Sequence, residues 1–103
     1  KLMYNHENLS SRFAVETYLK GIKIISDIVG WDRIIEEGEC DIFRTTEELY
    51  ERFPIYRERD AKVYDKVDDY YVWTNLNNDN KLKRLNKLIT KFDILGMTCS
   101  IDL

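Results

Sequence analysis

The stretch AKVYDKVDDYYVWTNLNNDNKLKRLNKLITKFDILGMTCSIDL, residues 61–103, carries the clearest folding signals of the chain. In its first run Val63 and Val67 roughly alternate with polar residues, and side chains on a strand point to opposite faces with a period of two. The next run, YYVWTN, is rich in aromatic and β-branched residues, which favour strands. Asp68 and Asp69 lie between the two runs and suit a tight turn. The pattern therefore predicts a hairpin.

A helix follows the hairpin, and a last strand follows the helix. Asn78 or Asp79 is placed to cap the helix, and Gly96 is a natural stop because glycine adopts a left-handed backbone easily. The run 97–103 alternates apolar and polar residues, as a strand with one buried face does. Apolar residues of the helix recur at spacings of three and four, which puts them on one stripe: Leu82, Leu85, Leu88, Ile89, Phe92 and Leu95.

The first part of the chain predicts a short strand at residues 1–5 and a long helix from about Ser10 to Val29, ended by Gly30. Residues 31–44 are read either as a strand pair or as a loop, with Ile34-Ile35 and the run 40–43 strand-like.

Further along, Thr45 and Glu48 have the spacing of a capping box and predict a short helix. Pro54 stops that helix, because proline cannot continue it. A charged connection, IYRERD, leads from there to the hairpin.

Both ends of the chain combine a short apolar run, an Asn-containing break and a long amphipathic helix that stops near a glycine. This pattern is typical of an α+β fold in which two long helices pack on one face of a small antiparallel sheet, a ferredoxin-like split β-α-β arrangement. The segment 45–53 is then an inserted helix. A winged-helix-like layout, with the wing at residues 63–75, is the alternative.

Size and composition indicate one domain, residues 1–103, with a real core and a charged surface. The chain is 44% hydrophobic and 34% charged, and its net charge of −3 argues against bulk electrostatic binding to nucleic acid. No run approaches the ~20 apolar residues of a membrane span. Cys40 and Cys99 are expected to be reduced, buried thiols in a cytoplasmic protein.

The search for chemistry finds no motif. The four glycines are isolated and form no phosphate-binding loop, and the acidic run at residues 36–41 lacks the ligand spacing of a calcium or zinc site. His6 is the single histidine, and no flanking motif pairs it with a cysteine. We therefore expect no catalytic, cofactor-binding or metal-binding residues, and no enzymatic activity.

Aromatic side chains on the hairpin form the first candidate surface. If the valines face the helices, then Tyr64, Tyr71 and Trp73 face the other side of the sheet, with Asp68 and Asp69 beside them. Tyr and Trp are enriched at protein-binding hot spots. The competing interpretation is that residues 31–60, or a second copy of the chain, cover these rings.

The basic helix forms the second candidate surface. Cations near a helix N-terminus oppose the macrodipole, and such an uncompensated local feature can mark a functional surface. The competing interpretation is a solvated face whose charges are neutralised by acids elsewhere in the fold. Residues 80–92 hold five cations and no acid: Lys81, Lys83, Arg84, Lys87 and Lys91.

These features favour a non-enzymatic protein-binding module, such as a small regulator, an inhibitor or an immunity-type protein. Its partner would be a protein, and a basic one would suit the acids of the hairpin turn. A nucleic-acid-binding domain that uses the basic helix is the alternative. A structural or homodimeric domain stays open as a third reading.

Overall fold

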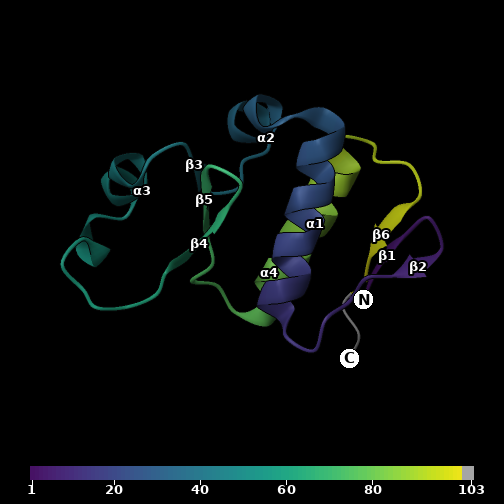
Figure 1. Cartoon of the computed structure of the whole chain (residues 1–103), viewed down its shortest axis with the longest axis horizontal. Helices are drawn as coiled ribbons and strands as arrows, with labels where there is room; N and C mark the ends of the chain where they lie inside the picture. Colours follow the sequence, from purple (N-terminus) through teal and green to yellow (C-terminus); the bar gives the residue numbers. More distant parts are fainter. Residues whose placement is uncertain (101–103) are drawn as a thin grey trace.

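A computed structural model describes residues 1–100. Two helices stand side by side between two small antiparallel sheets (Figure 1). The elements follow one another in this order: β1 (Leu2–Tyr4), β2 (Glu7–Asn8), α1 (Ala14–Val29), α2 (Trp31–Glu37), β3 (Ile42–Phe43), α3 (Thr46–Arg52), η1 (Pro54–Tyr56), β4 (Tyr64–Val67), β5 (Tyr70–Trp73), α4 (Asn78–Lys91) and β6 (Met97–Cys99).

The six strands of residues 1–100 divide into two sheets, one of order β2-β1-β6 and one of order β3-β5-β4. In the first, Leu2 lies opposite Cys99, so the two ends of the described chain are paired. In the second, Ile42 and Asp65 flank Val72 from opposite sides. The predicted α+β class is confirmed. The ferredoxin-like arrangement is not confirmed, because the strands of residues 1–100 form two sheets, and the winged-helix layout is not confirmed either.

The main core lies between α1, α4 and the two sheets. It takes Leu2 and Met97 from one sheet and Val72 from the other, so both sheets seal the helix pair from water. The two helices approach closely at Gly21, where an added Cβ would lie 2.5 Å from a methyl carbon of Leu85.

A second, smaller cluster lies on the other face of β5. Its buried members are Leu49, Val63 and Trp73, and α3 and η1 cover them. Successive side chains of a strand alternate between faces, so Val72 belongs to the main core while Trp73 belongs to the second cluster. Strand β5 therefore separates the two clusters and contributes a side chain to each. The prediction that Val63 faces the long helices is wrong, because it precedes β4 and packs beside Trp73 instead.

Several predicted signals at helix ends and in the hairpin turn are confirmed. Thr45 caps α3 by accepting a hydrogen bond from the N–H of Glu48 at 3.1 Å. Gly30 ends α1 with a φ of 88°. Asp68 occupies the first turn position of the β4–β5 hairpin with a φ of 53°.

Other boundaries differ from the prediction. Helix α4 is capped by Asn77, whose side chain accepts from the N–H of Asn80, and not by Asn78 or Asp79. Helix α1 begins at Ala14 and not near Ser10, because the Ser10 hydroxyl accepts from the N–H of Leu2. The strand predicted at residues 97–103 is present at Met97–Cys99, and its last three residues lie outside the described part.

The segment 31–44, for which the sequence allows either a strand pair or a loop, begins with a helix that covers half of it. Ile34 and Ile35 lie in α2, where Ile34 is fully buried in the main core. The strand-like run that follows is confirmed for Ile42–Phe43 only. A two-residue apolar run fits a helix and a strand equally well, and here the packing against α1 decides.

Candidate partner-binding surface

Ten apolar side chains, most of them aromatic, gather on the β3-β5-β4 sheet and the helical segment that covers it. Only three of them are buried. The others are half-buried rings and side chains that surround Trp73 and reach the molecular surface: Phe43, Tyr50, Phe53, Tyr56, Tyr64, Tyr71 and Leu76. We call these seven residues the aromatic rim.

Ring stacking fixes the geometry of the rim. Phe53 stacks on Trp73 with centroids 3.8 Å apart, and Tyr56 meets the same indole edge-on at 5.3 Å. Tyr64 and Tyr71 lie opposite one another on β4 and β5 with centroids 5.5 Å apart. Offset and edge-to-face pairs of this kind hold rings rigidly. The rim therefore presents preformed aromatic surface.

Cations lie over several of these rings. The guanidinium carbons of Arg52, Arg57 and Arg59 lie 4.9–5.5 Å from the ring centroids of Phe53, Tyr50 and Tyr56, respectively. The ammonium of Lys66 lies 5.7 Å from the Tyr71 ring. Exposed Ile55 projects from η1 beside them, with 63% of its surface accessible.

The structure separates the five residues predicted for this surface. Tyr64 and Tyr71 are half-exposed members of the rim. Trp73 is only 4% exposed, so the prediction that it stands on an open face is wrong. Residues 46–56 cover it, which is the competing interpretation that the sequence left open.

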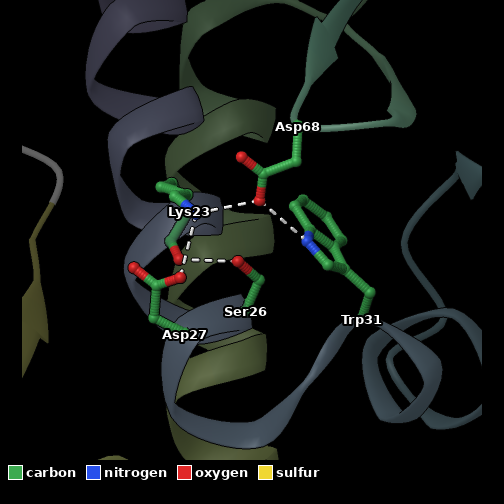
Figure 2. A network of polar contacts seen from close by, with 5 residues as sticks. All are labelled: Lys23, Ser26, Asp27, Trp31 and Asp68. Atoms are coloured by element: carbon green, nitrogen blue, oxygen red, sulfur yellow. Dashed lines mark hydrogen bonds and ion pairs between the residues drawn. The ribbon is translucent and has the colours of Figure 1, made fainter.

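Asp68 has a structural role in the β4–β5 turn (Figure 2). One carboxylate oxygen accepts from the Lys23 ammonium at 2.8 Å and from the Trp31 indole N–H at 3.0 Å. The hydrogen bonds from Lys23 and Trp31 lower the pKa of Asp68. Trp31 in turn stacks on Tyr70 at 4.5 Å. The hairpin turn is thus fastened to α1 and α2, while Asp69 is exposed.

The five cations of α4 also divide into two groups. Lys81 is buried and donates to the Leu76 carbonyl at 2.8 Å. Arg84 is paired with Asp41 at 2.9 Å in a half-buried site. The Arg84 charge is thus compensated by an acid that is distant along the chain, which the sequence alone does not reveal, while Lys81 is held by a backbone carbonyl.

The remaining three cations form one exposed row. Lys83, Lys87 and Lys91 recur every four residues, so they share a face of α4. No ion pair joins them to any residue in the described range 1–100. One acid, Glu39, lines a hollow of about 400 Å³ together with Lys87 and Lys91.

The acidic and sulfur-bearing side chains of residues 1–100 are dispersed. Groups of three or more His, Cys, Asp or Glu side chains that could hold a metal ion do not occur there. Cys40 is 7% exposed, and its burial raises the pKa of the thiol to about 12, which disfavours the nucleophilic thiolate. Among the described helices, none has the length and apolar character to span a bilayer.

The aromatic rim extends beyond what the sequence suggested. Tyr50, Phe53 and Tyr56 join it from a segment that the sequence indicated only as a helix and a charged connection. Alternating arginines and aromatics in YERFPIYRER were the available signal. Comparison with protein-family models, with curated proteins and with solved structures found no match to this chain.

Proposed function

We propose that this protein is a non-enzymatic protein-binding module, and that its aromatic rim is the contact surface. The observation that carries the proposal is the ratio of half-buried to buried side chains around Trp73. Seven members of the cluster stay partly open while three are buried. Burial of exposed aromatic surface is the main favourable term in protein association. A partner would complete the small cluster.

The composition of this surface fits a protein partner. Tyr, Trp and Arg are the residues that most often carry binding energy at interfaces. Here four tyrosines and three arginines surround one tryptophan. Acids on the same segment, Glu47 among them, pair with some of the arginines and oppose phosphate. A regulator, inhibitor or immunity-type role in the cytoplasm fits such a module.

Site-specific photocrosslinking tests the proposal. A benzophenone amino acid at Ile55, which is 63% exposed beside the rim, should capture a protein from lysate of the source cells. The matched control is the same probe at Leu95, which is 83% exposed in the loop between α4 and β6. Capture at both positions alike, or at Leu95 alone, would contradict the proposed surface.

A double substitution then tests the residues themselves. Tyr64→Ala with Tyr71→Ala should weaken binding of the captured protein in calorimetry, because it removes two half-exposed rings. Tyr4→Phe, in β1, is a control for general effects of changing a tyrosine. Undiminished binding by the double variant, with its fold retained, would remove these tyrosines from the interface.

Nucleic-acid binding by α4 is the second candidate, and the row Lys83, Lys87 and Lys91 favours it. Binding through phosphate contacts should weaken steeply with salt, because counterions are released. The test is charge reversal at these three lysines, followed by electrophoretic mobility shifts at low and high salt. Arg84 is left unchanged, since its loss would strand Asp41 in a half-buried site.

A further inference from the structure

An apolar groove lies between α1 and β4, on the opposite side of the β3-β5-β4 sheet from the rim. Its volume is about 640 Å³. The apolar lining is continuous with the main core, because each contributing side chain packs against that core: Leu9, Leu19, Ile24 and Val67. The groove is therefore a place where core-forming side chains stay open at the surface.

Strand β4 forms the outer edge of its sheet. The N–H of Thr74 donates to the carbonyl of Val63 at 2.9 Å. This bond shows which facing residues of β4 and β5 are hydrogen-bonded pairs. Residues opposite each other in an antiparallel pair alternate between bonded and non-bonded pairs. The peptide groups of Asp65 and Val67 therefore point toward β5, and those of Tyr64 and Lys66 point away.

The outward groups of Tyr64 and Lys66 have no backbone partner within the described chain. An edge of this kind is a template for another strand. A segment that adds to an edge gains main-chain hydrogen bonds, and alternate side chains gain pockets. Here the apolar groove beside Val67 supplies such a pocket.

The charged side chains around the groove indicate which kind of peptide segment could add to the β4 edge. Lys20, Lys23 and Lys66 line it, against the single acid Glu16. Lys23 is neutralised by Asp27 and Asp68. Lys20 and Lys66 make no ion pair within residues 1–100. Lys20 leaves positive charge in the groove of an acidic protein, and the Lys66 ammonium lies at the same edge but toward the rim, 5.7 Å from the Tyr71 ring.

We propose that this groove and the β4 edge bind an extended segment of a partner protein in which acidic and apolar residues alternate. The segment adds as a fourth strand beside β4 and directs apolar side chains toward Leu19 and Ile24. Alternate side chains of a strand point to opposite faces, so its carboxylates face Lys66 on the rim side, and an acidic residue at the end of the segment approaches Lys20. The edge borders the aromatic rim, because Tyr64 belongs to the rim and the Lys66 ammonium lies 5.7 Å from the Tyr71 ring. The groove itself lies on the opposite face, and the two surfaces are tested with different variants.

The probe is a phage-displayed library of short random peptides selected against the whole protein. Selected peptides should alternate acidic and apolar residues. Titration of one such synthetic peptide should shift the NMR signals of the Tyr64 and Lys66 amides and of the Ile24 methyl groups. Selection of peptides that shift only signals elsewhere, or of none, would overturn the proposal and leave Lys66 as a guard against edge-to-edge aggregation.

Lys66→Pro and Lys66→Ala separate backbone pairing from side-chain charge. Proline is tolerated on an edge strand where the N–H faces solvent, so Lys66→Pro should keep the fold, as circular dichroism would show. It removes one outward donor and should weaken peptide binding about tenfold beyond the effect of Lys66→Ala. Equal binding by the two variants would exclude strand addition at this edge.

Charge reversal gives an independent readout that does not depend on proline. Lys20→Glu should weaken binding of the same peptide about tenfold at low ionic strength, and the effect should shrink as salt is added. Lys87→Glu, on the exposed row of α4, is the matched control and should leave binding unchanged. Equal losses from both variants would show a non-specific charge effect and contradict the proposed groove.

Discussion

Asp68 joins three elements through one carboxylate oxygen, and its removal should loosen the hairpin. In Asp68→Asn the ion pair to Lys23 is lost and the bond from the Trp31 indole is weakened. We expect a lower midpoint of urea-induced unfolding at pH 7, and tryptophan fluorescence monitors that unfolding. Because the side chains of Asp68 and Lys23 are accessible to solvent, added salt should reduce the difference in urea midpoint between the variant and wild type.

The same carboxylate predicts a pH dependence with a definite sign. The pKa of Asp68 is lowered in the folded state, first by Lys23 and then by Trp31. A lowered pKa means that the folded state favours the charged form, so the contribution to stability is present at neutral pH. It should fade as the pH falls below about 3.9, the ordinary aspartate value, toward the folded pKa. Wild type and Asp68→Asn should therefore converge in urea midpoint at acid pH, and a constant difference would contradict the assignment.

Trp73 is a packing residue, and its substitution should act on stability. It is buried against Phe53 and Tyr56. Trp73→Ala should lower the free energy of unfolding by about 3–5 kcal/mol, the usual loss for a buried aromatic side chain. Chemical denaturation measures this, and Trp31 remains as a fluorescent reporter. A loss below about 1 kcal/mol would mean that the second cluster adds little to the fold.

Gly21 lets α1 and α4 approach each other closely, and filling this contact should destabilise the protein. Alanine raises helix propensity by about 1 kcal/mol, but its Cβ would lie 2.5 Å from a methyl carbon of buried Leu85. Overpacking costs about 1–3 kcal/mol, so Gly21→Ala should be destabilising overall. The double variant with Leu85→Val should be less destabilised than the sum of the two single changes, because the shorter side chain makes room. Strict additivity in denaturation experiments would show that the contact does not limit the approach of the helices.

Sequence periodicity could predict the two long helices, the hairpin and the Thr45 cap, because each depends on residues close together in the chain. It could not predict α2, where only Ile34 is fully buried and packing decides the local structure. Nor could it predict the division into two sheets, since strands of two to four residues carry little information about their partners.

The candidate sites show the same limit. The alternation in β5 correctly placed Val72 and Trp73 on opposite faces, but it could not say what covers either face. Similarly, the cations of α4 were visible as a run, whereas the pairing of Arg84 with Asp41 needed the fold. The sequence indicates which face of a strand or helix carries a side chain. Packing of distant segments decides whether that face is covered or exposed to solvent.

At the scale of the whole molecule, the two clusters should differ in local stability. Among residues 1–100, the main core has fourteen buried residues and the second cluster has three. Regions with little buried apolar surface open at lower free energy than the core. Native-state hydrogen exchange should therefore show faster exchange in α3 and β4 than in α1 and α4.

Strand β5 makes this prediction sharper, because it belongs to both clusters. If the second cluster opens by itself, the Trp73 amide, which donates to the Asp41 carbonyl at 2.9 Å beside core residue Ile42, should stay protected while the amides of α3 exchange. Exchange measured at increasing urea separates local from global opening. A single opening free energy for α1, α3 and α4 would contradict two levels of stability and would mean that α3 and η1 unfold only with the core.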